Sequence, residues 1–288
     1  MVYGSTCVSV MRLGGSGVKI LRRTDIEAIG NRVYAAYRTL PKIAEQRMIC
    51  AVDPDILLTD LLGLRVDYKH LSIDRRIYGT TSTRAVRVML CQEEFQEDFY
   101  FLDGKTILIE TDLQKDSLMA GKCRFTKCHE ASHHIYKMLY PQFYGYNDDE
   151  TDPVLHFSRE PEKRTGIITD WEEWQADVLA SCLLLPEELV RQGMYQIGLG
   201  EKVECLNRIY CPDVYAKVNT LAQMLGSSIT ALANKMQRHG LLDRNQLHDP
   251  YEYWGVYIDI PHTDRWRNDL ELRRDHLKRK YENKEKMP

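Results

Sequence analysis

The chain has 288 residues and a formal net charge of −3, with 43% hydrophobic and 28% charged residues. These proportions are those of a globular protein with a sizeable core, so they exclude a wholly disordered chain. The small negative charge excludes a general electrostatic attraction to nucleic acid or to anionic membranes. The mostly apolar run Val178–Leu185 is far shorter than the roughly 20 residues of a membrane helix. Residues 1–18 lack the apolar segment of a secretory signal, so we expect a cytoplasmic protein with mostly reduced cysteines.

The first third of the chain contains two predicted helices followed by predicted strands. Apolar residues at helical spacing predict helices over Thr24–Leu40 and Asp53–Leu62. Segments rich in β-branched and aromatic residues predict strands over Arg65–Leu71, Ala85–Leu90 and Phe99–Ile109. Asp103-Gly104 is a typical hairpin turn, so Phe99–Leu102 is expected to pair with Thr106–Glu110. Together these segments predict a small, mainly antiparallel sheet.

Helical periodicity returns at Ser117 and again after a long interruption. Residues Pro141–Ile168 contain three prolines and an acidic run, so we interpret them as a long connection without elements of its own. A second strong helix is predicted over Asp170–Leu185, and Pro186-Glu187-Glu188 is expected to begin the next one. The apolar spacing within 214–242 predicts two helices, Val214–Gly226 and Ser228–Leu242, with the rhythm of a helix-turn-helix pair.

One short segment, His129-Glu130-Ala131-Ser132-His133, indicates a chemistry. Helix positions i and i+4 share a face, so both imidazoles can reach one metal ion, with Glu130 directed toward its bound water. This is the arrangement of a zinc hydrolase. Because roughly 1% of chains of this length would contain the motif by chance, a histidine-rich helix face with Glu130 in solvent remains the competing interpretation of the motif alone.

A catalytic zinc ion needs a third protein ligand, which we expect from the helix Asp170–Leu185. Glu173 and Asp177 are four residues apart, so Glu173 can bind the metal while Asp177 accepts a hydrogen bond from a ligand imidazole. Glu172 is turned about 100° from Glu173 on an ideal helix and is the weaker candidate ligand.

Four other side chains near the motif are alternatives. Cys123 and Cys128 flank it, but they lack the second cysteine pair that a four-thiolate zinc site requires. His134 points away from the face shared by the motif histidines, which favours a surface or supporting role. His156 can reach the site only if the connection that contains it folds over the site.

Such a site constrains the reaction. Three protein ligands leave one zinc position to a water molecule, whose pKa falls to about 7. Glu130 then accepts the proton of this water and later delivers one to the leaving amine, which predicts amide hydrolysis. The side chain that stabilises the oxyanion is not assigned by the sequence, and manganese or iron could replace zinc on such ligands.

Two segments, Arg124–His133 and Glu173–Pro186, resemble the ImmA/IrrE family of metallopeptidases. The likeness lies in the Arg-Phe-Thr lead-in to the histidine motif, the strand Thr106–Glu110 before it, and the Ala-Asp and Leu-Leu-Leu-Pro elements of the second segment. The helix pair Val214–Leu242 is also similar to the family's C-terminal part. The link between the two segments is longer here than is usual in the family, and the residues after 242 are extra.

The resemblance extends over residues 55–245 and implies a zincin-like domain in which His129, His133 and Glu173 are the zinc ligands and Glu130 is the catalytic base. We therefore expect an α+β protein with four regions, which are an N-terminal extension and helix (1–54), a zincin-like metallopeptidase domain (55–200), a C-terminal helix-turn-helix-like helical part (201–245) and a charged tail (246–288).

The resemblance also implies a substrate class, because family members are associated with cleavage of helix-turn-helix repressors that control stress or mobile-element genes. The leading hypothesis is thus a zinc endopeptidase that cleaves a regulatory protein, expected to be a DNA-binding repressor. One alternative is a non-proteolytic binding module of a toxin–antitoxin, phage or mobile-element system. The other is a DNA-binding regulator, but the second helix of the pair offers only Lys235 and Arg238 as strong basic contacts, so direct nucleic-acid binding is not expected.

Overall fold

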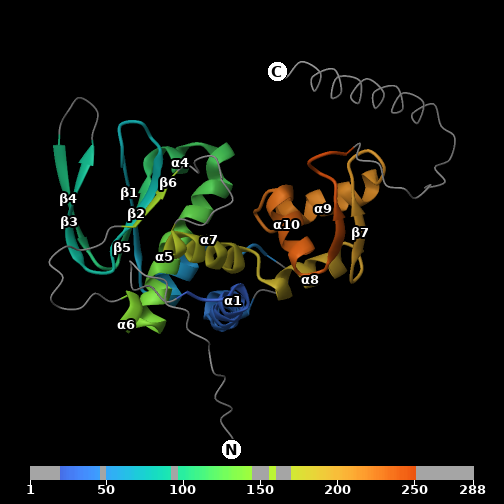
Figure 1. Ribbon diagram of the computed structural model, residues 1–288, viewed down its shortest axis with the longest axis horizontal. Coiled ribbons are helices and arrows are strands. Elements are labelled where there is room, and N and C mark those ends of the chain that lie inside the picture. Colours follow the sequence, from blue (N-terminus) through green and yellow to red (C-terminus); the bar gives the residue numbers. More distant parts are fainter. Residues whose placement is uncertain (1–19, 46–49, 92–96, 145–155, 160–169, 251–288) are drawn as a thin grey trace, which may run out of the picture.

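The computed structural model describes residues 20–45, 50–91, 97–144, 156–159 and 170–250. These residues form a mixed α+β fold with small sheets and several helices (Figure 1). One half of the molecule contains the larger sheet and the long helices beside it, and the other half contains a group of shorter helices with a pair of short strands. None of the helices in the described part combines the length and the apolar content that a membrane crossing requires.

The larger sheet has four strands in the order β1 (Arg65–Lys69), β5 (Thr106–Glu110), β2 (Ile77–Thr81) and β6 (His156–Arg159). The pairing of β5 with β1 is parallel, whereas β5–β2 and β2–β6 are antiparallel. Every residue of β5 is buried, as expected for an inner strand of mainly β-branched and aliphatic residues. The sheet is therefore small and mainly antiparallel, as predicted.

The predicted pairing across Asp103-Gly104 is wrong. Strand β4 (Glu97–Asp103) pairs with β3 (Ala85–Cys91) in a separate two-stranded sheet, and β5 belongs to the larger one. The turn does form, because Gly104 has a φ of +81° and the Asp103 carboxylate accepts hydrogen bonds from Lys105 and Thr106. However, β5 is already paired on both sides, so the turn carries the chain from one sheet into the other.

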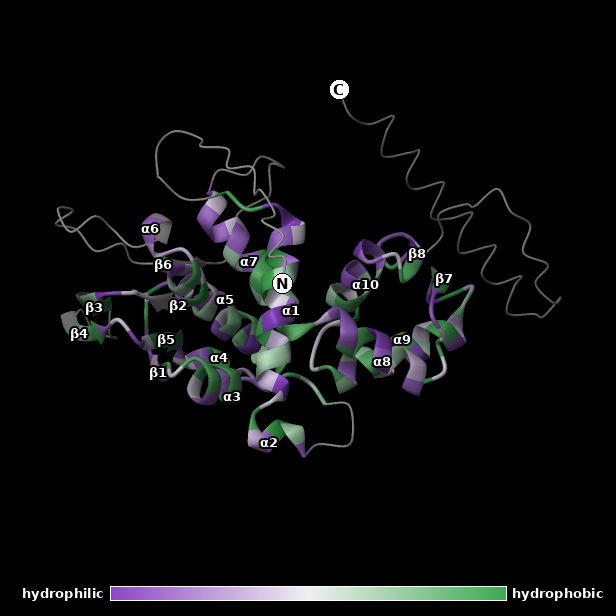
Figure 2. Cartoon of the chain, turned by 90° about the horizontal axis from the view of Figure 1, so that it is seen from below, coloured by the Kyte–Doolittle hydropathy of each residue, from purple (hydrophilic) through white to green (hydrophobic). Residues whose placement is uncertain are grey.

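The helices of this half include the predicted ones. The helices are α1 (Arg23–Arg38), α2 (Pro41–Ala44), α3 (Pro54–Ile56), the π-helical turn η1 (Leu57–Leu61), α4 (Thr111–Lys115), the 3₁₀ turn η3 (Ser117–Met119), α5 (Ala120–Leu139), α6 (Pro141–Tyr144) and α7 (Trp171–Leu184). The predicted ones are present as α1, α3 with η1, α5 and α7, whereas α2, α4 and α6 were not predicted. Helices α5 and α7 lie against each other, and α1 packs on α7. In Figure 2, hydrophobic residues run through the middle of the molecule where α1, α5 and α7 meet.

A glycine permits the close approach of α1 to α7. A Cβ atom at Gly30 would lie 2.7 Å from the Cβ of Cys182, which is closer than side-chain carbons approach one another. The buried core is continuous from α1 through α5 and α7 into the other half of the chain, and it includes Ile29, Ile135 and Leu183. The helix α7 is therefore fixed from two sides.

The second half contains α8 (Glu187–Gln196), β7 (Val203–Leu206), α9 (Pro212–Met224), α10 (Ile229–Arg238) and β8 (Leu242–Asn245). The two predicted helices of 214–242 are present as α9 and α10, and the hydroxyl of Ser228 caps α10 by accepting from the backbone N–H of Ala231. The last residues of that segment begin β8, which pairs in parallel with β7. This strand pair was not predicted.

The interpretation of Pro141–Ile168 as a connection without elements is also wrong in part, because it contains α6 and the edge strand β6. The remainder of that connection, residues 145–155 and 160–169, lies outside the described residues, as do the N-terminal residues 1–19 and the charged tail from residue 251.

Candidate metal centre

The two motif histidines lie on one buried face of α5, as the four-residue spacing predicts. Their Nε2 atoms are 3.4 Å apart, and the side chains of His129 and His133 are 4% and 0% exposed. The helix is stable at this point because it is 20 residues long and its inward stripe, including Cys128, Ala131 and Ile135, is fully buried. The motif therefore presents two neighbouring ring nitrogens to the same space.

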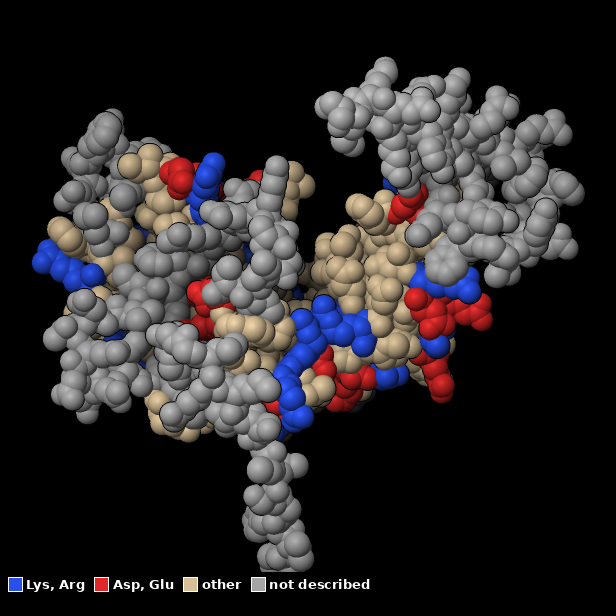
Figure 3. All heavy atoms as spheres, in the orientation of Figure 1, with Lys and Arg blue, Asp and Glu red and all other residues tan. Residues whose placement is uncertain are grey.

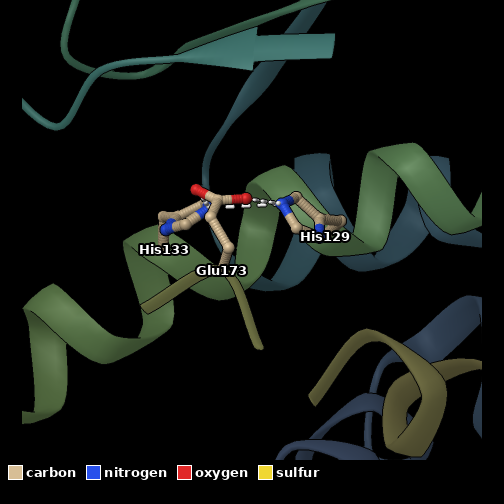
Figure 4. A group of neighbouring side chains, drawn as sticks. All are labelled: His129, His133 and Glu173. Carbon is tan, nitrogen blue, oxygen red and sulfur yellow. Dashed lines mark hydrogen bonds and ion pairs between the residues drawn. The ribbon is translucent and has the colours of Figure 1, made fainter. Parts of the chain in front are cut away.

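Glu173 reaches these rings from the first turn of α7. Its Oε2 lies 3.0 Å from Nε2 of His129, and its Oε1 lies 3.5 Å from Nε2 of His133. Figure 4 shows the carboxylate extending between the two rings. One potential ligand atom from each of the three residues lies within 4.8 Å of the others, so the group can hold a metal ion.

The start of α7 is fixed by an N-cap. The side chain of Asp170 accepts hydrogen bonds from the backbone N–H groups of Glu172 and Glu173, at 3.0 and 3.1 Å. This cap satisfies donors that would otherwise lack helical partners. It also sets the direction in which the first-turn glutamates leave the helix.

A buried glutamine ties α7 to its neighbours. The hydroxyl of Tyr136, on α5, donates to the backbone carbonyl of Gln175 at 2.9 Å. The side-chain oxygen of the same glutamine accepts from the backbone N–H of Leu21 at 2.8 Å. Because buried polar groups are costly without partners, these bonds favour one register of α7 against α5.

Carboxylates also lie at the second nitrogen of each motif histidine. Asp177 Oδ1 is 3.0 Å from Nδ1 of His129, at the place predicted for it. Glu172 Oε1 is 3.6 Å from Nδ1 of His133. Glu172, predicted as the weaker candidate ligand, therefore lies on the far side of His133 from Glu173.

The acids around His129 stabilise positive charge at the centre. Burial opposes protonation of its ring, but hydrogen bonds with Asp177 and Glu173 outweigh burial and raise the pKa of His129 to about 10. Burial lowers the pKa of His133 well below 6.5, and the adjacent His129 acts in the same direction. Burial also raises the pKa of Glu173, against the effect of His129. A divalent cation would supply the positive charge that this cluster of donors otherwise obtains from a proton.

Glu130 is completely buried and lies under strand β2. A Cβ atom at Gly79 of β2 would come within 2.9 Å of Glu130 Oε1 and 2.5 Å of the Thr126 methyl group. A glycine at this position therefore lets the strand backbone approach the carboxylate. Neither β2 nor Gly79 was predicted from the sequence, although a glycine inside a strand segment often marks a bulge, a bend or a close approach of another group.

The other candidates of the sequence analysis lie elsewhere. Cys123 and Cys128 are buried outside the three-residue group, and burial raises the pKa of Cys128 to about 12, so its thiol stays protonated. His134 turns to Thr81, with Nε2 2.7 Å from the hydroxyl oxygen. The backbone of His156 is the first residue of β6, but its side chain lies outside the described atoms.

A second group of possible donors, not predicted from the sequence, lies at the end of the larger sheet. It consists of His70, Glu110 and Asp112. Here Arg75 occupies the position of a cation, with Nη1 3.4 Å from Glu110 and Nε 3.7 Å from Asp112. The Glu110 carboxylate also accepts from the backbone N–H of Leu71 and caps α4. This group is a structural ion-pair network.

No protein-family model matches the chain, and no curated protein sequence does so either. Two imidazoles and one carboxylate are a donor set that suits several divalent transition metals.

Proposed function

We propose that the chain is a zinc-dependent endopeptidase of the ImmA/IrrE type. The observation that carries this proposal is the convergence of His129, His133 and Glu173 from two helices, with the buried carboxylate of Glu130 on the turn that holds the histidines. Two imidazoles and a glutamate are the ligand set of one class of zinc peptidases. The resemblance of the two motif segments to the family supports the same assignment.

The residues of the centre have different roles in the proposed hydrolysis. The zinc ion would be held by His129, His133 and Glu173. As a Lewis acid, it would lower the pKa of a bound water to about 7. Glu130 accepts the proton of the attacking water and transfers it to the amine nitrogen of the leaving peptide. Asp177 keeps the ring of His129 oriented through Nδ1.

The proposed substrate is a regulatory protein of the DNA-binding repressor class. This part of the proposal rests on the resemblance of the two motif segments to the family.

The α9–α10 pair offers little support for the alternative of a DNA-binding regulator. Lys235 is 3% exposed, and its Nζ lies 3.5 Å from the buried Sγ of Cys182. Of the two basic contacts expected on this helix, only Arg238 is exposed. On the face shown in Figure 3, basic and acidic side chains lie interspersed over this half of the molecule. Phosphate binding favours a basic surface of one sign.

The proposal is tested with Glu130→Gln, which keeps the size of the side chain and removes its basicity. Wild type and variant are loaded with zinc and incubated with a panel of purified helix-turn-helix repressors, and cleavage is followed by intact-protein mass spectrometry. We expect wild type to cleave a panel member and the variant to be at least about 100-fold slower while binding zinc equally, since general-base catalysis contributes about this factor. Equal repressor binding without cleavage by either protein would instead identify a binding module.

A further inference from the structure

Glu172 lies beside the second ring nitrogen of His133, which Glu173 does not contact. The two glutamates are consecutive in the first turn of α7, and their backbone N–H groups share the Asp170 cap. Successive residues of a helix diverge by about 100°, so the side chains leave the helix in different directions. Glu173 reaches Nε2 of His133, whereas Glu172 reaches Nδ1 of the same ring. The first turn of α7 thus approaches both nitrogens of one imidazole.

A histidine that binds a metal through Nε2 needs a hydrogen-bond acceptor at Nδ1. A neutral imidazole that gives the lone pair of Nε2 to a metal carries its proton on Nδ1, and this proton needs an acceptor. His133 is 0% exposed, so its acceptor must come from the protein or from buried water. Glu172 Oε1, at 3.6 Å, would form that hydrogen bond after an approach of less than about 1 Å.

At the other histidine, a carboxylate already occupies the corresponding position at a shorter distance. Asp177 lies four residues after Glu173 and is within hydrogen-bond distance of Nδ1 of His129. Glu172 and Asp177 therefore each face the Nδ1 atom of one ring, Asp177 at 3.0 Å and Glu172 at 3.6 Å. Glu172 is also well sheltered, with a side chain that is 19% exposed against 44% for Asp177. A charge-assisted hydrogen bond in a sheltered position is stronger than one in water.

We propose that Glu172 is a positioning residue for His133, and that it acts as the counterpart of Asp177 by holding the ring with its proton on Nδ1 and its lone pair on Nε2. The inference rests on the proposed metal centre, and it assigns to Glu172 a role in metal affinity without direct contact to the metal. It also accounts for two consecutive glutamates at the start of α7, where a single one would suffice as a ligand.

The experiment measures the zinc dissociation constant of the full chain by competition with a chelator of known affinity. Glu172→Ala should weaken zinc binding by about 10- to 100-fold, the usual effect of removing a carboxylate behind a ligand histidine. Glu172→Gln should recover part of this loss, because its amide oxygen can still accept the Nδ1 proton. The matched control is Glu201→Ala, since Glu201 is exposed and far along the chain from the centre, and its zinc affinity should equal that of wild type.

A double-mutant comparison separates positioning from general damage to the fold. If Glu172 acts through His133, adding Glu172→Ala to His133→Ala should cause no further loss of zinc affinity. Its effect should instead add to that of Asp177→Asn, which acts on the other ring. In nitrogen-edited NMR spectra of the zinc-loaded protein, the Nδ1 proton of His133 should shift and exchange faster in Glu172→Ala, while that of His129 stays unchanged.

The outcomes distinguish this inference from the proposed function. Wild-type protein that binds no zinc would overturn both. Wild type that binds zinc, with Glu172→Ala binding equally tightly, would overturn the role of Glu172 and leave the metal centre intact. A further loss of affinity in the His133→Ala background would show that Glu172 acts on the fold rather than on the ring. If Glu172→Ala does not fold, Glu172→Gln and its combination with His133→Ala provide the same comparison.

Discussion

The molecule contains two groups in which one or more histidines lie close to carboxylates, and they differ in what balances the negative charge. At the α5–α7 centre, the acids Glu173 and Asp177 face the two nitrogens of His129. At the end of the larger sheet, Glu110 faces His70, but Arg75 also contacts it and Asp112. Donor atoms at metal-binding distance are thus not sufficient evidence for a metal site. A fixed cation among them indicates that the charge is already neutralised.

The largest effect that tests this contrast is the loss of metal. Glu173→Ala should lose zinc almost completely, with a fall in affinity greater than the about 100-fold expected from a residue behind a ligand. Glu110→Gln should retain the wild-type zinc content, because Arg75 already occupies its group. Plasma mass spectrometry after dialysis against a weak chelator measures both. If Glu110→Gln loses zinc and Glu173→Ala keeps it, the metal binds at the group of His70, Glu110 and Asp112 and not at the α5–α7 centre.

For stability we expect the opposite order: Glu110→Gln should lower the free energy of unfolding more than Glu173→Ala does. Glu110 is almost completely buried and bonds to Arg75, His70 and the Leu71 backbone. Glu110→Gln should therefore lower the free energy of unfolding of the metal-free protein by about 3 kcal/mol, as expected when a buried ion pair loses one charge. Glu173→Ala should lower it by less, because Asp177 still lies within hydrogen-bond distance of His129 Nδ1 and burial already disfavours the charged form of Glu173. Urea titrations in the presence of chelator measure the difference, and equal losses would remove the contrast.

A third test concerns the backbone of β2 at Gly79, which lies against Glu130 and Thr126 of α5. Gly79→Ala would place a methyl group against Thr126 and Glu130, so it should lower the free energy of unfolding by about 1–3 kcal/mol. It should also slow repressor cleavage, because Glu130 has to move. Gly121→Ala on α5 is the control, since a Cβ atom there meets nothing within 4 Å. If the free energy of unfolding were unchanged in both variants, the backbone of β2 would be able to move away from Glu130 at no cost, which would contradict this prediction.

The smallest expected effect concerns His134, whose neighbour is a hydroxyl rather than a carboxylate. Burial, with Lys137 acting in the same direction, lowers the pKa of His134 from 6.5 to about 4. The unfolded chain therefore binds this proton more readily, and the stability contributed by the neutral ring is lost as the pH falls below 6.5. Between pH 6.5 and 5.5 wild type should lose about 1 kcal/mol more than His134→Gln. Parallel pH profiles for the two proteins would contradict the shift.

The sequence predicted those parts of the centre that depend on helix geometry. The four-residue spacing places His129 beside His133, and the same spacing relates Glu173 to Asp177, so all four could be found from one helical rule. The place of Glu172 could not, because the rule says which way a side chain leaves its helix but not how far the second helix is rotated against the first. That rotation is set by contacts such as Tyr136 with Gln175, which are distant in sequence.

The strands were harder to predict for a related physical reason. Asp103-Gly104 correctly marks a turn, but turn chemistry fixes a reversal of the chain and not the partner of the strand that follows. β5 pairs instead with β1 and β2, and the strand pattern of β2 is weakened by Gly79 in its middle. The parallel pair β7–β8 joins four-residue strands separated by two helices, so local pattern carries no sign of it.

The hydrogen bond between Leu21 and Gln175 joins positions that are 154 residues apart. During synthesis, the histidines of α5 are made well before Glu173. Helix α1 likewise can pack against α7 only after α7 has been made. In the proposed centre the three ligands therefore come together only after α7 has been made, and zinc binding there would require that the segment before α1, α5 and α7 are already assembled.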